Sequence, residues 1–391
     1  MEIRIIHDFR LQCSAVLISN EAMVSAFAPG RLELIGNHTD YNEGYVLAFA
    51  INLGITAEGD GRDDETIKLH NVEFGEDSFS VNNIDKNVRT PWANYFKGVL
   101  FQLQQAGMSF GGFEVTISGT LPSGAGMSSS AAVAVATALF VQKLFNLNLG
   151  DLTDPVVRMN LAVLCRAAEN DFVGVKCGIL DQATSLLGRK DHAVFLNCRL
   201  GTAELVPLHP DFCFVVCHTG VKHMLLSSKY NQRRSECEEA VRILQMNKIP
   251  AQSLRDVTST DIQQNAGLFQ PRVFQRAMHV TTENERVLAA ASALLQNDML
   301  TLGRLMYESH ASSREAFENS TPFLDQLVEI AGTLPGCVGA RLTGGGFGGT
   351  TINLVYRTQV ESFMAELVRL YREKSGKEPQ AWIVEASDGA A

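Results

Sequence analysis

The sequence predicts an α+β protein built from two lobes with a cleft between them. Its 391 residues exceed the size at which a single hydrophobic core usually keeps growing. Hydrophobic residues make up 46% of the chain, which suits a globular protein throughout. Strand-like and helical patterns follow one another without an internal repeat, a low-complexity stretch or an obvious linker. From this order of elements we divide the chain near residue 200.

The first lobe begins with strand-like sequence around a polar turn. Residues 23–56 are apolar on both sides of GNHTDYNEG (36–44), which we call the polar loop. WANYFKGVLFQLQQ (92–105) has apolar residues at helical spacing, and GFEVTISG (112–119) alternates as a strand. A turn rich in glycine and serine follows, and then a long helix. A further helix with mixed faces is expected over 156–172.

The second lobe ends in a recognisable order of elements. Before it, strands are expected over 191–198 and 212–220, and helices over 230–245 and 285–307. The last section runs from strand to glycine turn, strand, helix and strand, as CVGARLT, GGGFGG, TTINLVY, TQVESFMAELVRLYREKSG and QAWIV. An antiparallel pair, a covering helix and a returning strand are typical of a ferredoxin-like lobe.

Charge and cysteine content limit the partners. The net charge of -10 argues against nucleic acid or an anionic membrane as the main partner, since both attract clustered lysine and arginine. It does not argue against ATP, because a local loop and a cation can override a screened global charge. The eight cysteines include no CxxC pair and are expected to be reduced thiols. With no signal-peptide core and no 18-residue apolar span, we expect a cytoplasmic protein.

Residues 122–131, PSGAGMSSSA, form what we call the serine loop. A glycine-rich turn that opens a helix surrounds phosphate with backbone N–H groups, and the positive end of the helix dipole points at the anion. No GxxxxGK[ST] motif occurs, so no loop lysine neutralises the phosphates. Serine hydroxyls and a distant carboxylate that hold Mg²⁺ would be sufficient. The alternative is an ordinary turn.

The polar loop and the strand before it concentrate polar residues. Within APGRLELIGNHTDYNEG these are Arg31, Glu33, Asn37, His38, Asp40 and Asn42. Short polar side chains around a glycine turn suit a polyhydroxylated ligand, because carboxylate and amide oxygens accept from hydroxyls while amide and guanidinium groups donate. A solvated loop with an Asx turn is the alternative. A metal site is disfavoured because no further histidine or cysteine lies nearby.

Two acids flank a glycine-interrupted turn in CRAAENDFVGVKCGILDQ (165–182). Glu169 lies on the predicted helix, and Asp181 opens a second apolar segment. One carboxylate could hold Mg²⁺ while the other accepts the proton of an attacking hydroxyl, which is the division of labour that phosphoryl transfer requires. A carboxylate beside a glycine turn is also often a helix N-cap.

The segment GGGFGG (344–349), which we call the glycine loop, satisfies GxGxxG but is followed by a strand. A dinucleotide-binding loop must open a helix, so we reject that interpretation. Two alternatives remain. The loop presses closely against a ligand or the other lobe because glycine has no Cβ, or it is a flexible hairpin turn.

These motifs together resemble the galactokinases of the GHMP small-molecule kinase family. The resemblance runs from about residue 25 to the C-terminus. Three blocks appear in family order and spacing, APGRLELIGNHTDYN, LPSGAGMSSSAA and RLTGGGFGG, with PWANY, ENDFVGVKCGILDQ, HMLLSSKY and ASDGA as secondary marks.

The resemblance implies a fold and a set of site residues. The first lobe, residues 1–200, would be of the ribosomal S5 domain 2 type, rejoined by the tail 378–391, and residues 201–377 would form the ferredoxin-like lobe, with the active site in the cleft between them. Asp181 would face the anomeric hydroxyl with Arg31 beside it. The sugar-pocket positions would be Arg31, Glu33, Asn37, His38, Asp40, Cys177, Gly178, Asp181 and Tyr230. The ATP positions would be Trp92, Gly124, Gly126, Ser128, Ser129 and Ser130, and the Mg²⁺ ligands Ser130 and Glu169.

The chain departs from the family pattern at two positions. Galactokinases usually have RVNLIGEHTDYN, so asparagine and glutamate stand where this chain has Glu33 and Asn37. The resemblance implies a monomeric, ATP- and Mg²⁺-dependent enzyme of galactose metabolism that forms galactose 1-phosphate. Asn37 leaves a related sugar such as N-acetylgalactosamine as an alternative substrate, and a galactokinase-like sugar sensor is an alternative function. If Asn37 contacts the sugar, N37E should improve kcat/KM for galactose.

Overall fold

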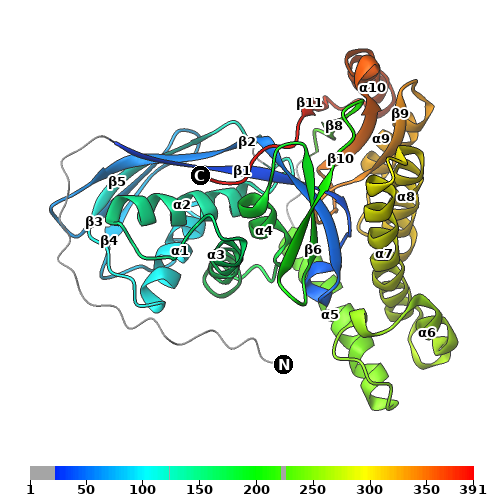
Figure 1. Cartoon of the computed structure of the whole chain (residues 1–391), viewed down its shortest axis with the longest axis horizontal. Helices are drawn as coiled ribbons and strands as arrows, with labels where there is room; N and C mark the ends of the chain where they lie inside the picture. Colours follow the sequence, from blue (N-terminus) through cyan, green and yellow to red (C-terminus); the bar gives the residue numbers. More distant parts are fainter. Residues whose placement is uncertain (1–22, 123, 222–225) are drawn as a thin grey trace.

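The computed structural model describes residues 23–122, 124–221 and 226–391, and it divides into two sheets with their helices (Figure 1). Among the described residues the first sheet has seven strands, in the order β4-β3-β5-β2-β6-β7 with β1 paired to β2. They are β1 (Val24–Ile35), β2 (Tyr45–Gly61), β3 (Thr66–Asn71), β4 (Gly75–Ser80), β5 (Phe113–Gly119), β6 (His192–Asn197) and β7 (Thr202–Pro207). Neighbouring strands are antiparallel except β3 and β5, which are parallel.

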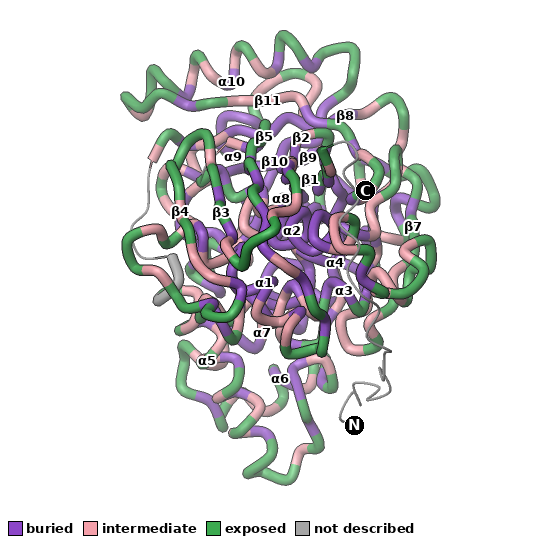
Figure 2. Tube along the Cα trace, turned by 90° about the vertical axis from the view of Figure 1, so that its left-hand side faces the viewer, coloured by how far each residue is buried: buried purple, intermediate pink, exposed green. Residues whose placement is uncertain are grey.

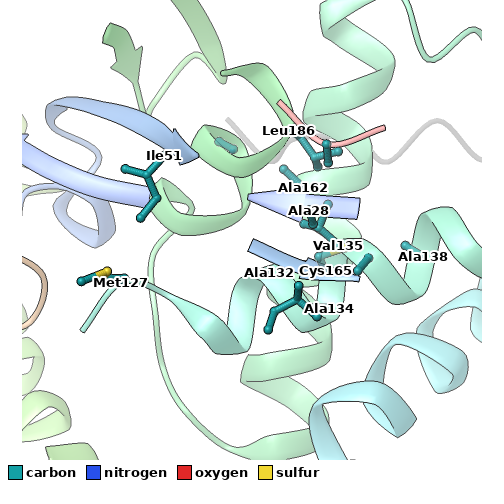
Figure 3. Packing of buried hydrophobic residues seen from close by; sticks show 14 of the residues in the cluster. Ala28, Ile51, Met127, Ala132, Ala134, Val135, Ala138, Ala162, Cys165 and Leu186 are labelled. Atoms are coloured by element: carbon teal, nitrogen blue, oxygen red, sulfur yellow. The ribbon is translucent and has the colours of Figure 1, made fainter. Parts of the chain in front are cut away.

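Four helices gather on one side of the first sheet (Figure 1). They are α1 (Ala93–Gln105), α2 (Ser129–Phe145), α3 (Pro155–Ala167) and α4 (Leu180–Leu187). The α2 helix packs against β1, β2 and the other three helices, and its alanine-rich sequence allows that close approach because the side chains are small. Figure 3 shows Ala132, Ala134 and Val135 of α2 near Ala28 of β1 and Ala162 of α3. The buried α2 therefore fixes where the serine loop lies.

The second sheet is antiparallel, in the order β11-β8-β10-β9. Its strands are β8 (Phe212–His218), β9 (Cys337–Leu342), β10 (Thr350–Tyr356) and β11 (Gln380–Val384). Helices α8 (Met299–Ser312), α9 (Pro322–Thr333) and α10 (Val360–Ser375) pack against it. The α10 helix buries Val360, Phe363, Leu367 and Tyr371, which lie on one face at helical spacing. The ferredoxin-like order predicted from the sequence is confirmed.

The remaining helices form a third packed region. The helices α5 (Leu226–Met246), α6 (Ser259–Gln264) and α7 (Pro271–Leu295) share a hydrophobic cluster. The α7 helix also packs against α8, whereas α5 and α6 extend beyond the two sheets at one end of the molecule (Figure 1). Short helical turns are Asp40–Asn42, Ala168–Val173, Leu254–Asp256, Ala266–Leu268, Ser313–Phe317 and Arg357–Gln359. Figure 2 shows buried residues gathered around α2, with exposed residues on the outer turns of α10 and in the α5–α6 region.

The sheets shift the proposed domain boundaries. The predicted division near residue 200 falls between β6 and β7, which pair in the first sheet, so we place it after Pro207. The tail 378–391 serves both lobes. Its strand β11 pairs with β8 in the second sheet, whereas Ser387 and Ala391 donate backbone hydrogen bonds to Ala50 and Phe27 of the first. The tail therefore rejoins the first lobe only after residue 384.

Some sequence features lie outside the described residues, namely the first 22 residues, Ser123, Lys222 and the start of the HMLLSSKY segment (223–225). Within the described residues, none of the helices combines the length and the apolar character needed to cross a bilayer.

Candidate active site

The serine loop turns the chain into α2 through left-handed backbone conformations. Gly124 has φ 75° and Gly126 φ 69°, values that glycine adopts without strain, and Ser128, the N-cap of α2, has φ 59°. Two contacts fix the loop: Arg31 N donates to Met127 O (3.2 Å), and the Thr350 hydroxyl donates to Ala125 O. The loop thus joins β1 to β10, and the N-terminal end of α2 presents the positive dipole that favours an anion.

Asp181 is held beside this loop by two side chains. It lies in the first turn of α4, and its Oδ1 accepts from Arg31 Nε (2.8 Å) and Nη2 (2.7 Å). Ser128 Oγ donates to Oδ2 (2.6 Å), and Arg31 Nη1 donates to Gly126 O (2.9 Å). Arg31 is only 5% exposed and lies at a register shift of β1 that directs its side chain. The structure therefore brings an oriented carboxylate and a guanidinium against the serine loop.

A second carboxylate, that of Asp40, lies close to the first. Gly178 makes room for it, because a Cβ at that position would lie 1.9 Å from Asp40 Oδ2. The backbone N–H of Tyr41 donates to Asp40 Oδ1 (2.9 Å). Burial and the nearby charge of Asp181 raise the pKa of Asp40 to about 6. The predicted sugar residues Asp40, Gly178 and Asp181 are therefore together in the fold.

His38 lies in an aromatic wall and has φ 62°. Its Nε2 is 3.0 Å from Gly345 O and its Nδ1 is 2.9 Å from the Tyr41 hydroxyl. A carbonyl only accepts, so the neutral ring donates from Nε2 and accepts at Nδ1. Burial lowers the pKa of His38 to about 3. The rings of Tyr230 and Phe317 lie 5.0 and 4.5 Å away, so His38 and Tyr230 belong to one cluster, and both nitrogens of His38 are engaged by the protein.

The Glu169 carboxyl group lies near the start of α2. It is 4% exposed, its Oε1 accepts from Gln182 Nε2 (2.8 Å), and the Ser130 hydroxyl also hydrogen-bonds to it. Burial and the charge of Asp181 raise the pKa of Glu169 to about 8. The described residues contain no cluster of three or more histidine, cysteine or acidic side chains suited to a metal. One carboxylate and one hydroxyl fit Mg²⁺, which usually keeps few protein ligands and completes its shell with phosphate oxygens and water.

The two other predicted positions border this region. Trp92 immediately precedes α1 and is half-buried, and its indole Nε1 is buried with no hydrogen-bond partner among the described residues. One turn later, Tyr95 has its pKa raised to about 12 by burial and by the charge of Glu169, which places it near that carboxylate. Cys177 Sγ donates to Asn170 Oδ1 (3.2 Å), and burial raises the pKa of its thiol. Cys177 is therefore an unreactive thiol of the site wall.

Glu33 and Asn37 are directed into the protein. Glu33 is 2% exposed, and its Oε1 accepts from Arg341 Nη1 (2.9 Å) and Asn37 Nδ2 (3.2 Å). Asn37 is 0% exposed; its Nδ2 also donates to Gly344 O (2.7 Å), and its Oδ1 accepts from Asn319 Nδ2 (2.7 Å). Burial raises the pKa of Glu33 above its ordinary value, although Arg341 opposes the shift. In this arrangement both side chains are buried and hydrogen-bonded to other groups of the protein.

The glycine loop supplies the close approach that the sequence left open. Gly344 and Gly345 offer carbonyls to Asn37 and His38. A Cβ on Gly344 would lie 3.2 Å from Gly126 O, so the loop also lies against the serine loop. The interpretation of the glycine loop as one that presses against the other lobe is confirmed.

With this geometry in place, comparison with known proteins identifies the family. Family models match residues 94–189 (GHMP kinases N terminal domain), 17–59 (galactokinase galactose-binding signature) and 290–373 (GHMP kinases C terminal). A galactokinase of Chloroflexus aggregans is 41% identical over 367 residues, covering 94% of this chain and 92% of that protein. The chain belongs to the galactokinase family. A galactokinase of Roseiflexus sp. (strain RS-1) is 42% identical over 93% of this chain and 91% of its own length.

Solved structures agree with this family. The galactokinase of Lactococcus lactis complexed with galactose has a TM-score of 0.90 and 34% identity, and the match covers 96% of each chain. A mevalonate kinase of Methanococcus jannaschii, at TM-score 0.63 and 18% identity over 95% of this chain and 100% of that one, shares the fold. The predicted family and the two-lobed α+β fold are confirmed. The roles given to single galactokinase residues stay predictions.

Sequence reasoning missed the residues of α7 that hold the polar loop of this galactokinase homologue. Glu283 Oε1 accepts from the backbone N–H groups of Gly36 and Asn37, both at 3.0 Å. His279 Nε2 lies 3.0 Å from Asn37 O, and Asn284 Oδ1 accepts from Tyr45 N (2.9 Å). Burial alone would raise the pKa of Glu283, but Arg286 and Arg341 hold it well below its ordinary value. The available signal was the spacing of His279 and Glu283, which are four residues apart and therefore on one face of a helix.

Proposed function

We propose that this protein transfers the γ-phosphoryl group of ATP to the anomeric hydroxyl of galactose, which gives galactose 1-phosphate and ADP. The observation that carries the proposal is the Asp181 carboxylate, held between Arg31 and Ser128 at the N-terminal end of α2. Membership in the galactokinase family supports galactose as the sugar, since the similar Lactococcus lactis structure is a galactokinase complexed with galactose.

The chemistry follows from these positions. The sugar hydroxyl passes its proton to Asp181 as its oxygen forms a bond to the γ-phosphorus, and the bond from that phosphorus to the β-phosphate oxygen breaks. Phosphoryl transfer needs positioning and charge stabilisation more than covalent chemistry from the protein. Arg31 holds Asp181 in one orientation and stabilises negative charge next to the serine loop. Asp40, half-ionised near pH 6 and mostly ionised at pH 7, accepts a hydrogen bond from another sugar hydroxyl.

Ser130 and Glu169 would hold the Mg²⁺ that accompanies ATP, and the ion would neutralise charge on the phosphate oxygens. Trp92, whose neighbour Tyr95 lies near Glu169, is proposed to lie against the adenine. We also propose a cytoplasmic monomer. The net charge of -10 supports small molecules rather than nucleic acid or membranes as its partners.

The alternatives have less support. An N-acetylated hexosamine was suggested by a neutral Asn37 facing the sugar, but the Asn37 side chain is completely buried with its donors and acceptor engaged. A non-catalytic sensor would not need the intact combination of Ser130, Glu169 and Asp181.

The test is an ATP-consumption assay with purified protein across aldoses and amino sugars, with ³¹P NMR to locate the phosphate. Galactose should be phosphorylated at C1 with the highest kcat/KM. D181N should lower kcat by about 10²- to 10⁴-fold while galactose still binds. D261N is the matched control, because Asp261 also lies in a first helical turn and accepts a hydroxyl hydrogen bond, from Thr258 (2.7 Å), but on the distant α6. Near-normal turnover of D181N would remove Asp181 from this role, and absence of galactose turnover in the wild type would refute the proposal.

A further inference from the structure

Asn319 contacts both loops that meet at the sugar site. It follows the helical turn Ser313–Phe317 and is 0% exposed. Its Nδ2 donates to Asn37 Oδ1 (2.7 Å) in the polar loop and to Gly345 O (3.2 Å) in the glycine loop. Its backbone carbonyl accepts from Phe347 N (2.5 Å). One buried residue therefore joins the polar loop to the glycine loop.

The fit between Asn319 and the glycine loop is tight. A Cβ on Gly346 would lie 2.3 Å from Asn319 O and 2.7 Å from its Nδ2, so any larger residue at 346 would displace one of the two segments. Gly346 also has φ 75°, in the region that favours glycine. Glycine is therefore required at position 346 both by the contact with Asn319 and by the backbone conformation of the turn.

Asn37 depends on this donor for its orientation. Its two N–H bonds point to Glu33 and Gly344 O, so its Oδ1 needs donors from the other side. Asn319 Nδ2 supplies the short bond, and Ser313 Oγ is more distant at 3.4 Å. Without Asn319, a buried acceptor loses its principal partner, which is costly in a site closed to water.

The consequence reaches the residues expected to bind the sugar. Gly345 O also accepts from His38, and a Cβ on Gly344 would lie 3.8 Å from the guanidinium nitrogens of Arg31. A shift of the glycine loop would therefore move the His38 ring and change the space beside Arg31. Asn319 itself is completely buried and is not among the groups that face the Asp40 and Asp181 carboxylates.

We propose that Asn319 is a positioning residue of the sugar site: its side-chain amide holds the glycine loop against the polar loop and so fixes the wall formed by His38. Asn37 serves as its acceptor and does not contact the sugar. The proposal rests on the proposed galactose kinase function for its kinetic consequence, but its structural part stands independently of that function.

The test compares N319L and N319S with the matched pair N353L and N353S. Asn353 of β10 is also 0% exposed, and its Nδ2 donates to a backbone carbonyl (Val215 O, 2.9 Å). In both asparagines the Oδ1 atom has no hydrogen-bond partner among the described residues. The Asn353 variants remove a similar buried amide without touching the polar loop. If the leucine variants do not fold, the comparison is made with N319S and N353S, in which the introduced side chain is smaller.

Two measurements decide the outcome. In the Asn319 variants the KM for galactose should rise at least about tenfold while the KM for ATP changes less than about threefold, as expected when a buried hydrogen bond at one subsite is lost. Hydrogen exchange of residues 343–349 should accelerate at least about tenfold in these variants and not in the Asn353 variants. Unchanged exchange in this loop, or a rise in both KM values equal to that of the Asn353 variants, would overturn the proposal. If the wild type does not phosphorylate galactose, the proposed function fails, and the exchange experiment still decides whether Asn319 positions the loop.

Discussion

The exchange of Glu33 and Asn37 relative to other galactokinases gives the sharpest prediction, because the structure buries both of these side chains. Replacing Asn37 by an acidic residue should lower the free energy of unfolding and should not raise kcat/KM for galactose. In N37D the side chain keeps its shape, but an oxygen replaces Nδ2, which donates to Gly344 O (2.7 Å) and Glu33 Oε1 (3.2 Å). Glu33 Oε1 keeps its bond from Arg341, but Gly344 O and the new carboxylate oxygen are left without a donor. At about 1 to 3 kcal/mol for each unsatisfied group, the loss of unfolding free energy is about 2 to 6 kcal/mol.

A second substitution should restore part of that loss. In E33Q/N37D the side-chain amide introduced at position 33 can donate to the carboxylate introduced at position 37, and the net charge around Arg341 returns to its original value. The bond to Gly344 O is not restored. E33Q alone leaves Arg341, which is 0% exposed, without its carboxylate partner, and removing one partner of a buried ion pair costs about 3 to 5 kcal/mol. The double variant should therefore lose at least about 2 kcal/mol less than the sum of the single variants.

The assay is urea unfolding of the four proteins at one pH, with kcat/KM for galactose measured beside it. A coupling energy near zero would show that residues 33 and 37 act independently, which contradicts the hydrogen bond between them. A kcat/KM that improves in N37D or N37E would show that this side chain faces the sugar after all.

Three further substitutions test the site. R31K keeps the charge but loses the fork that holds Asp181, so kcat should fall about 10²-fold in the ATP-consumption assay. G178A places a Cβ 1.9 Å from the Asp40 carboxylate, so the KM for galactose should rise at least about tenfold. Glu169, with its pKa raised from 4.5 to about 8, takes up a proton on folding, so without Mg²⁺ wild-type stability should fall relative to E169Q as pH rises from 5 to 8, by at most about 1.4 kcal/mol per unit in urea unfolding.

For each of these substitutions, one result would contradict the role that we predict for the residue. Normal kcat in R31K would show that one point charge suffices beside the carboxylate. For G178A the control is G332A, since a Cβ on Gly332 of α9 meets only the Tyr307 ring and hydroxyl at 3.4 Å or more. If both glycine variants change the KM alike, the approach of Asp40 is not responsible. A stability difference between E169Q and wild type that does not depend on pH would mean that Glu169 is ionised normally.

The sequence predicted many of the strongly patterned elements, but it missed short polar strands, the first half of α7 and the whole of α9. The helices α1, α2 and α10 and the strands β5, β8 and β10 were expected, because their apolar periodicity is set by one buried face. The strands β3, β4 and β7 were not predicted. Segments such as GEDSFS and TAELVP are short and polar, and their extended form depends on hydrogen bonds to a neighbouring strand. For the same reason the boundary was placed before β7.

Site residues could be predicted from the sequence where polar side chains stand close to glycines within one short segment. The serine loop, Asp181, Glu169 and Asp40 stand beside glycines that their backbone or packing requires, and the structure brings them together. The orientation of Asn37 was not predictable. It is decided by Asn319, which is 282 positions away in the chain, so its effect exists only after the lobes have packed.

The balance of charge in the site explains why a serine loop without a lysine can still bind a nucleotide. Three acidic side chains, those of Asp40, Asp181 and Glu169, lie near one guanidinium, that of Arg31, and burial together with the charge of Asp181 raises the pKa values of Asp40 and Glu169. A triphosphate would add further negative charge, so under the proposed function we expect it to bind together with a cation. At pH 7 Glu169 is largely protonated in the ligand-free protein, and a cation that binds there displaces the proton. If Mg²⁺ binds at Glu169 together with the nucleotide, as proposed, their binding should therefore release protons to the buffer.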